Sequence, residues 1–253
     1  MPMKIQRYGW IPDLPDHRDY MYAAAPEVLA KLPPSADLTD LCPPVYDQGQ
    51  LGSCTANAIA AAIEFDLMKQ NLQIFVPSRL FIYYNERAME GTVTCDSGAQ
   101  IRDGIKSVVN QGDCPETLWP YDIAEFAVKP PANCYTQAKK YRAVNYQKLV
   151  QDLNQFKGCL YSGYPFVFGF TVYESFESQT VAQTGHAPMP ASGEKVLGGH
   201  AVMAVGYDDS NQWFIVRNSW GESWGMKGYF TLPYAYFLNG NLSSDFWTMH
   251  VIS

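Results

Sequence analysis

The sequence lacks two features that would point to a membrane or a nucleic acid. No run of about 18 consecutive apolar residues occurs in its 253 residues, so we expect no transmembrane helix and no membrane partner. The chain has 18 Lys and Arg residues against 25 Asp and Glu residues, and its net charge is -7. The Lys and Arg residues form no cluster. Because nucleic-acid binding depends on concentrated positive charge, we also expect no nucleic-acid partner.

An apolar signal-peptide core is also missing, since residues 1–22 are polar and contain prolines. We therefore expect a protein that is cytoplasmic or exported by a non-classical route. The cysteines include no C-x-x-C pair and no zinc-site spacing, so we expect neither a metal nor a cofactor. One or two disulfides stay possible among Cys42, Cys54, Cys95, Cys114, Cys134 and Cys159.

At 47% hydrophobic residues the chain can bury a full core, as one domain or as two lobes. Residues 1–31 are aromatic and turn-rich without hydrophobic periodicity, which predicts an extended arm with a short helical patch at 23–31. Pro33 and Pro34 stop any helix and place the start of the main domain near residue 32. Two interpretations of the arm stay open: it packs permanently on the domain, or it covers a functional cleft.

Hydrophobic patterns divide the remaining chain into two halves. Helical spacing predicts helices from Cys54, from about Ser78, over 100–110 and over 146–161. Strands are predicted at 165–172, 200–207, 212–217, 228–232 and 245–252, with a hairpin connection at 208–211. We therefore expect an α+β fold in two lobes, helical over about 45–145 and strand-rich over about 146–253, with a cleft possible between them.

One cysteine stands where a glycine-containing loop, Gln48–Ser53, becomes a predicted helix. We expect this helix to be amphipathic and Ser53 to cap it, because the apolar residues recur at one-face spacing after Cys54. In the first turn, unpaired backbone N–H groups and the helix dipole favour a thiolate. A small buried and inert cysteine fits the same pattern. This segment alone leaves both interpretations equally open.

A nucleophilic cysteine requires a base, and His200 is the best-placed candidate. It opens a predicted apolar strand directly after Gly198 and Gly199, which let a substrate or other backbone approach closely. Asn218 ends the next strand and could orient the imidazole, while Trp220 could shield their hydrogen bond from water. Without Cys54, His200 would more simply be a packed core histidine.

Gln48 completes the candidate site. Its side-chain amide precedes Cys54 on the same loop and could donate a hydrogen bond to a developing oxyanion. The backbone N–H of Cys54, at the helix start, would be the second donor.

These residues together resemble the papain family of cysteine peptidases. The resemblance covers about residues 33–253 in the order Gln48, Cys54, His200, Asn218, with Trp220-Gly221, Trp224-Gly225 and Gly228-Tyr229-Phe230 following. In that family the His and Asn lie about 130–150 residues after the Cys, and Asn218 is slightly farther. Gly9-Trp10-Ile11-Pro12-Asp13 is similar to the start of a divergent subgroup found mainly in bacteria.

Several positions depart from the family pattern. Leu51 replaces the usual cysteine, so the disulfide to the position of Cys95 should be absent. Thr55 replaces the usual Trp or Tyr after the nucleophile, and Asp96-Ser97-Gly98 only partly matches the Asn-Gly-Gly loop that holds substrate backbone. These changes leave fold and catalysis as expected but make substrate preference unsafe to transfer.

The resemblance implies a papain-like two-lobe fold with a helical lobe, a β-barrel-like lobe and the site between them. Cys54 would attack a peptide carbonyl as a thiolate paired with imidazolium His200, through an acyl-enzyme. The partners implied are a protein or peptide substrate and the arm itself, acting as a short propeptide across the cleft of a monomer. The residues expected to contact substrate are Gly98, Ala99, Ile101, Gly169, Gly198, Gly199 and Trp220, most of them around the pocket for the second side chain before the cut.

Two alternatives remain at this point. The altered loop at 96–98 is compatible with a side-chain amidase, deamidase or transpeptidase that uses the same Cys-His-Asn site. A non-catalytic binding module is less favoured, because Cys54 and His200 are both present.

Overall fold

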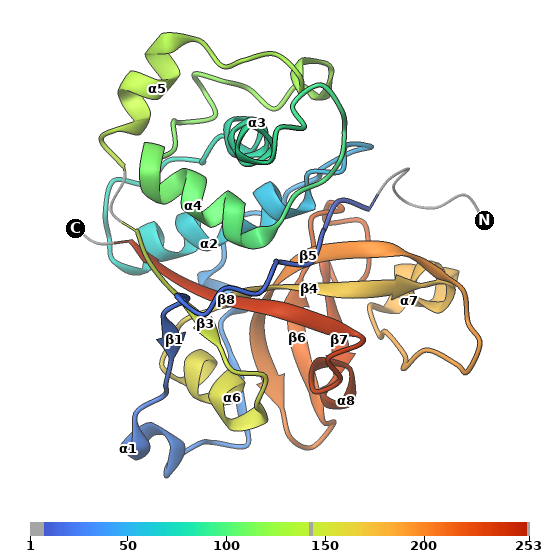
Figure 1. Ribbon diagram of the computed structural model, residues 1–253. Helices are drawn as coiled ribbons and strands as arrows, with labels where there is room; N and C mark the ends of the chain where they lie inside the picture. The colour runs from blue at the N-terminus through green and yellow to red at the C-terminus, as the bar shows by residue number, and fades with distance from the viewer. Residues whose placement is uncertain (1–7, 142–143, 252–253) are drawn as a thin grey trace.

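The computed structural model describes residues 8–141 and 144–251. The longer helices of the first half lie on one side of the molecule and the sheet lies on the other, where the remaining helices flank it (Figure 1). The longer helices of the first half are α2 (Cys54–Lys69), α3 (Arg79–Glu90), α4 (Ile101–Gln111) and α5 (Ala132–Ala138). The other helical segments are α1 (Pro26–Leu29), η1 (Thr39–Leu41), η2 (Ile123–Glu125), α6 (Leu153–Tyr161), η3 (Glu174–Glu177), α7 (Gln179–Thr184) and α8 (Tyr234–Phe237).

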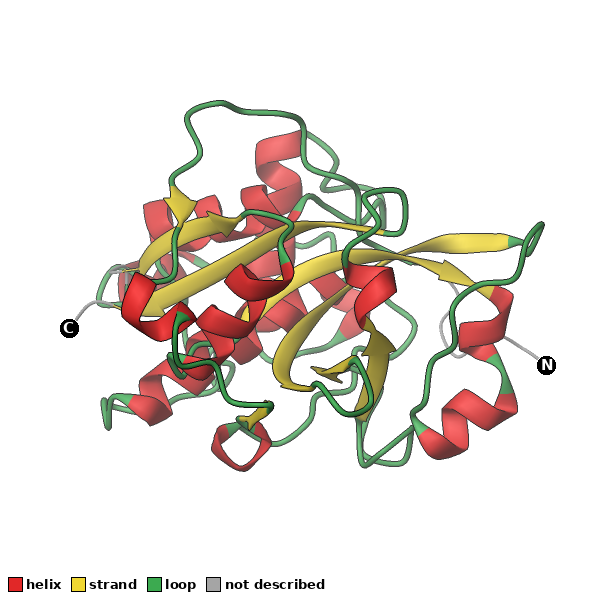
Figure 2. Cartoon of the chain, turned by 90° about the horizontal axis from the view of Figure 1, so that it is seen from below, coloured by secondary structure: helices red, strands yellow, loops and turns green. Residues whose placement is uncertain are grey.

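The described strands form one twisted sheet in the order β1-β3-β8-β4-β5-β6-β7, with β2 pairing on β5 (Figure 2). Their bounds are β1 (Met21–Tyr22), β2 (Ser35–Asp37), β3 (Val144–Leu149), β4 (Phe166–Tyr173), β5 (Val196–Asp208), β6 (Trp213–Arg217), β7 (Tyr229–Pro233) and β8 (Ser243–Val251). All pairings are antiparallel except β1 with β3. The predicted strands and the hairpin at 208–211 are therefore present, in a curved sheet that does not close into a barrel among the described residues.

Helix α2 lies at the centre of the fold and differs from its prediction. An apolar stripe was expected, yet the helix is buried on every side from Cys54 to Leu67. It packs against α3, α4, β4, β5 and β8, so no face remains for solvent. Small residues at Ala56, Ala58 and Ala60–Ala62 let these neighbours approach closely.

The predicted helix over 146–161 is wrong in its first half. Residues Val144–Leu149 form β3, which pairs with β8 and, through Lys148 and Leu149, with β1. The helix starts only at Leu153, where the Asp152 side chain accepts hydrogen bonds from the N–H groups of Asn154 and Gln155, both at 3.0 Å. Strand pairing thus overrides the helical spacing of Leu149, which lies before this cap.

The core on the sheet side is a cluster of stacked and edge-on phenylalanines. Phe156 of α6 packs against Phe166 and Phe246, with ring centroids 5.2 and 4.5 Å away. Phe168 and Phe237 extend the cluster, 4.4 Å apart. Each such ring contributes a large buried apolar area, so α6 and α8 are fixed against the sheet.

Two further findings concern the whole described chain. None of its helices is long and apolar enough to cross a membrane. All six cysteines are free thiols, so the disulfides left open by the sequence are not formed.

The cap of α6 provides a stability prediction. Asp152→Ala removes the acceptor for two orphan backbone donors and should lower the free energy of unfolding by about 1 kcal/mol. Asp152→Asn keeps an oxygen acceptor and should cost only a few tenths of a kcal/mol. Urea denaturation of both variants measures the difference, and equal losses would contradict the capping role.

Candidate active site

Cys54 is the first residue of α2 and is fully buried. Its sulfur lies against β5, where the backbone N–H of Ala201, the residue after His200, donates toward it, as do the N–H groups of Gly9 and Thr55. The predicted helix start is confirmed. Ser53 occupies the cap position without capping, because its hydroxyl instead contacts the Tyr121 hydroxyl at 2.5 Å and accepts from Asn57 at 3.0 Å.

His200, on β5, is held by Asn218 at the end of β6. Its Nε2 lies 2.8 Å from Asn218 Oδ1. The same oxygen accepts the backbone N–H of Ser219 at 2.8 Å, so it is an acceptor and the Nε2 atom carries the proton. In the neutral ring Nδ1 is then an unprotonated acceptor, and it has no hydrogen-bond partner among the described residues. The histidine therefore offers a free basic nitrogen next to the segment that contacts Cys54.

Trp220 covers this pair as expected. Its ring stacks on the His200 ring with centroids 5.0 Å apart and planes 25° apart, and it is fully buried. Trp224 packs edge-on against Trp220 at 4.9 Å. The two indoles exclude water from the hydrogen bond between His200 and Asn218, which strengthens it.

Gln48 is buried and fixed at both ends of its amide. Its Oε1 accepts from the Ser219 hydroxyl at 2.7 Å, and its Nε2 donates to the Leu51 carbonyl at 2.9 Å. The Gln48 backbone N–H bonds to the Ser219 carbonyl at 2.8 Å. One of the two Nε2 hydrogens is used by Leu51, and the second remains for another acceptor.

Burial sets the protonation states of the Cys–His pair. Desolvation raises the pKa of Cys54 to about 12, although backbone N–H donors from Ala201 and Gly9 act in the opposite direction. Desolvation also lowers the pKa of His200 to about 4. Both shifts favour the uncharged thiol and imidazole. With the arm in place, burial therefore favours the neutral pair over the thiolate–imidazolium pair.

The loop before Cys54 is tied to the segment at 95–98 without a disulfide. Leu51 is buried and Cys95 is a free, exposed thiol. In its place, the Gly52 N–H donates to both carboxylate oxygens of Asp96 at 3.1 Å, and Tyr83 also donates to that carboxylate. A half-buried, hydrogen-bonded carboxylate thus links the two segments in place of a covalent bond.

Thr55 points away from the cleft side into the helix packing. Its hydroxyl donates to Glu86 Oε1 at 2.6 Å, and both residues are fully buried. Burial raises the pKa of Glu86 well above its ordinary value, which favours the neutral, protonated carboxyl. The residue that replaces the usual aromatic therefore fixes α2 to α3.

The N-terminal arm runs between the helices and the sheet and covers this site (Figure 1). Gly9 and Trp10 pair with both walls: the Gly9 carbonyl accepts from Ala99 N–H at 2.8 Å, and the Trp10 N–H donates to the Gly199 carbonyl at 2.8 Å. The Tyr8 ring lies edge-on to His200, 6.0 Å between centroids, and its hydroxyl donates to Glu177.

Glycines make this close approach possible. A Cβ on Gly9 would lie 1.7 Å from the Gly52 carbonyl oxygen, and one on Gly98 would lie 2.1 Å from the Gly9 oxygen. A Cβ on Gly198 would lie 2.7 Å from Tyr8 Cβ. Neither wall could accept the arm in this position if these residues carried side chains.

The Trp10 pocket, formed by Gly169, Gly199 and Asp245, holds the Trp10 indole. A Cβ at Gly169 would lie 1.9 Å from the indole and one at Gly199 would lie 2.6 Å from it. The indole Nε1 donates to Asp245 Oδ2 at 3.1 Å. The structure therefore brings Gly98, Ala99, Gly169, Gly198 and Gly199 together around the arm.

Two of the expected substrate-binding residues are differently placed. Ile101 is buried in the core at the start of α4. Gly98 does not pair with the backbone of the arm, since its N–H donates to the Tyr83 hydroxyl at 3.2 Å and Ala99 makes the pairing instead.

Sequence patterns gave no sign of Asp245 or of its neighbour Asp13. The Asp13 N–H donates to Asp245 Oδ2 at 2.8 Å, and the Asp13 carboxylate accepts from the Trp247 indole at 2.8 Å and the Arg102 N–H at 3.1 Å. Burial, followed by the charge of Asp245, raises the pKa of Asp13 to about 6. Burial also raises the pKa of Asp245. The one feature of the sequence that could have drawn attention to Asp245 is an acidic residue in a strand of mostly apolar residues.

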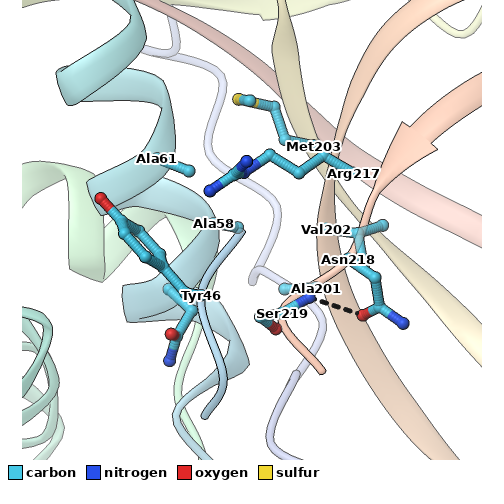
Figure 3. Close-up of a pocket in the computed structure, with 10 residues that line it drawn as sticks. Tyr46, Ala58, Ala61, Ala201, Val202, Met203, Arg217, Asn218 and Ser219 are labelled. Carbon is cyan, nitrogen blue, oxygen red and sulfur yellow. Dashed lines mark hydrogen bonds between the residues drawn. The ribbon is translucent and has the colours of Figure 1, made fainter. Parts of the chain in front are cut away.

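Behind the site, α2 and the sheet meet around a small cavity of about 10 Å³ (Figure 3). Arg217 projects into it from β6 toward α2 and donates to the carbonyls of Pro43 and Pro44 at 2.6 and 2.5 Å. A space of this size holds about one water molecule. The backbone that carries Asn218 is therefore closely packed from behind, and the arm covers the opposite side.

A family model described as papain family cysteine protease matches residues 32–241. The chain belongs to the papain family of cysteine proteases. It is thus a hydrolase of the cysteine-peptidase class, and the predicted family and α+β fold class are confirmed.

Individual relatives support the same assignment. An uncharacterized peptidase C1-like protein of Acanthamoeba polyphaga mimivirus is 50% identical over 216 residues, which are 82% of this chain and 70% of that protein. The crystal structure of Xylellain, a cysteine protease from Xylella fastidiosa, matches with a TM-score of 0.93 and 46% identity, over 100% of this chain and 99% of that one. A cathepsin B-like protein of Giardia intestinalis is 29% identical over 75% of this chain and 64% of its own length.

The buried thiol provides a prediction about reactivity. At pH 7 Cys54 should react with iodoacetamide more slowly than exposed Cys95, because Cys54 is desolvated and covered by the arm. Trp10→Ala removes the indole from its pocket and should speed labelling of Cys54 by at least about tenfold, while Cys95 stays unchanged.

Mass spectrometry of the two cysteine peptides measures both rates in one sample. Leu14→Ala changes an exposed arm residue and is the matched control. Equal Cys54 labelling in all three proteins would contradict the covering role of the Trp10 segment.

Proposed function

We propose that the protein hydrolyses peptide bonds with Cys54 as nucleophile, His200 as base and acid, and Asn218 as the residue that orients His200. The observation that carries this proposal is the imidazole fixed at Nε2 by Asn218 with Nδ1 unpartnered, beside the backbone that contacts the Cys54 sulfur. Such an arrangement is the recurring signature of an activated nucleophile.

The proposed reaction begins when the arm leaves and water and substrate enter. Proton transfer from Cys54 to His200 Nδ1 gives a thiolate and an imidazolium, and the thiolate attacks the peptide carbonyl. The second Nε2 hydrogen of Gln48 and the Cys54 N–H stabilise the oxyanion. His200 then protonates the leaving amine, and a water molecule, deprotonated by His200, hydrolyses the acyl-enzyme.

The arm is proposed to act as an intramolecular inhibitor. It occupies both walls of the cleft through Gly9 and Trp10, and it dehydrates the Cys–His pair so that the charged form is disfavoured. Either effect alone lowers activity. Together they keep the docked chain inactive without any change in the catalytic residues.

A side-chain amidase or transpeptidase is the alternative, and one observation favours it. The Gly98 N–H is already bonded to Tyr83, so the loop at 96–98 offers less to an extended substrate backbone than expected. Ala99 supplies that pairing to the arm, and for this reason we place peptide hydrolysis first.

Cys54→Ala should abolish hydrolysis of a peptide library, whereas Cys95→Ala, at an exposed free thiol, should retain it. Trp10→Ala in the same chain should raise the rate. Mass spectrometry of the products separates the two functions, because backbone cleavage yields shorter peptides and deamidation yields single-dalton shifts at intact length. Turnover that persists in Cys54→Ala would refute the assignment of the nucleophile.

Docking of the arm should weaken as the pH rises. In the docked form the pKa of Asp13 is raised from 3.8 to about 6, so docking takes up a proton between these values. The contribution of this group to docking is complete below about pH 4 and is lost as the pH rises through 6. We expect the wild-type rate, divided by the rate of Trp10→Ala, to increase about tenfold from pH 4.5 to 7.5.

Asp245→Asn keeps an oxygen acceptor for Trp10 but removes the charge that faces Asp13. Its rate, divided by that of the Trp10→Ala, Asp245→Asn double variant, should still rise with pH but less steeply, because burial remains the larger cause of the raised Asp13 pKa. Division by the loosened variant removes the pH dependence of catalysis itself. If the wild-type ratio instead falls as the pH rises, the proposed weakening of arm docking with pH is wrong.

A further inference from the structure

Arg79, the first residue of α3, is a buried cation that the proposed reaction does not use, with 8% of its surface exposed. Its guanidinium lies over the rings of Tyr46 and Tyr121, 4.7 and 3.9 Å from their centroids. One edge of the guanidinium, Nε and Nη2, donates to the two carboxylate oxygens of Glu116 at 2.9 and 2.8 Å. This two-bond pairing fixes the plane and the direction of the group, so the position of its remaining nitrogen, Nη1, is also fixed.

The Nη1 atom contacts both ends of the loop at 48–53. It donates to the Asp47 carbonyl, directly before the loop, and to Asn57 Oδ1 at the other end, both at 3.2 Å. The Asn57 side chain in turn donates to the Ser53 carbonyl at 2.9 Å. One guanidinium nitrogen therefore connects the start of the loop with its last residue, directly before Cys54.

The backbone around Gln48 is held from the sheet and from the helices at once. On the sheet side, the Gln48 N–H donates to the Ser219 carbonyl at 2.8 Å. On the helix side, the Asp47 carbonyl accepts from Arg79 at 3.2 Å, and the Gln48 carbonyl accepts from the Tyr121 hydroxyl at 2.9 Å. Because these contacts hold opposite sides of one short segment, loss of the Arg79 contact would let the Gln48 backbone rotate.

We propose that Arg79 is a positioning residue for the oxyanion site formed by the Gln48 amide and the Cys54 N–H. Oxyanion stabilisation depends on donors that are fixed in advance, and an error of about 1 Å in their place can cost about 10² in rate. Lysine carries the same charge without the planar fork, so it cannot bond to Glu116 and to the loop in this arrangement. This inference rests on the proposed peptidase function and adds a residue that acts through Gln48 and Cys54.

The test compares two reactions of Cys54 in the full-length chain. Peptide hydrolysis builds negative charge on oxygen, whereas a peptide of the same sequence that ends in a thiopyridyl disulfide is attacked at sulfur and releases 2-thiopyridone without an oxyanion. Arg79→Lys should lower kcat/KM for hydrolysis by at least about tenfold, through kcat, and should change the rate constant for the disulfide by less than about twofold. Because the arm must leave before either peptide binds, its docking cost cancels in the ratio of the two rate constants.

Arg87→Lys is the matched control. Arg87 is a buried arginine of the same helix, but its guanidinium donates to carbonyls of the segment at 93–95 and not to the loop at 48–53. This variant loses the same planar fork and should leave the ratio of the two rate constants unchanged. Glu116→Gln weakens only the contact that orients Arg79, so it should lower the ratio by less than Arg79→Lys does.

An unchanged ratio in Arg79→Lys, or in Glu116→Gln if the lysine variant does not fold, would overturn the positioning role while the peptidase function stands. An equal fall of the ratio in Arg87→Lys would overturn it as well, because the effect would then belong to any buried arginine of α3. Failure of both the wild type and Trp10→Ala to hydrolyse any peptide would overturn the proposed function together with this inference.

Discussion

The burial of α2 on every side is the constraint on which the site depends. A helix packed against α3, α4 and three strands has no freedom to rotate or slide, so its first residue, Cys54, stays against β5. His200 lies on the same strand. Its Nε2 bonds to Asn218, so only its Nδ1 lacks a hydrogen-bond partner among the described residues. The candidate reactive groups thus come from distant parts of the sequence and are aligned by packing, without a disulfide among the described residues.

The arm consists of two parts with different roles in the fold. Toward residue 24 the arm is fixed to the domain. Strand β1 pairs with β3, and Asp19 forms an ion pair with Arg102 at 2.6 Å. Ala24 packs so closely on Gly158 of α6 that a Cβ added to this glycine would lie 2.6 Å from the Ala24 Cβ. The segment from Tyr8 to Trp10 instead lies on the site. The two interpretations left open by the sequence therefore apply to different residues. A part of the arm that is fixed to the sheet keeps the covering part at high local concentration near the cleft.

Sequence patterns named the candidate site residues but not the contacts that hold the arm over them. Four residue types in a fixed order gave Gln48, Cys54, His200 and Asn218, because such chemistry permits few substitutions. The strand at 144–149 was missed because Leu149 also fits the helical spacing of Leu153, Phe156 and Leu160, and only pairing with β8 decides between helix and strand. Asp245 could not be found, since an acidic residue in a strand has meaning only when Trp10 and Asp13 are placed beside it. Contacts of this kind depend on register and on a bulge, which no local pattern encodes.

The carboxylate of Asp245 holds the arm at two points, through the Trp10 indole and the Asp13 N–H. The arm also brings a second carboxylate, that of Asp13, close to Asp245. Burial and the neighbouring charge raise the pKa of Asp13, so docking is favoured while this pair carries a proton. Rising pH removes that proton and weakens the proposed inhibitor, so one buried pair of acids would couple release of the arm to pH.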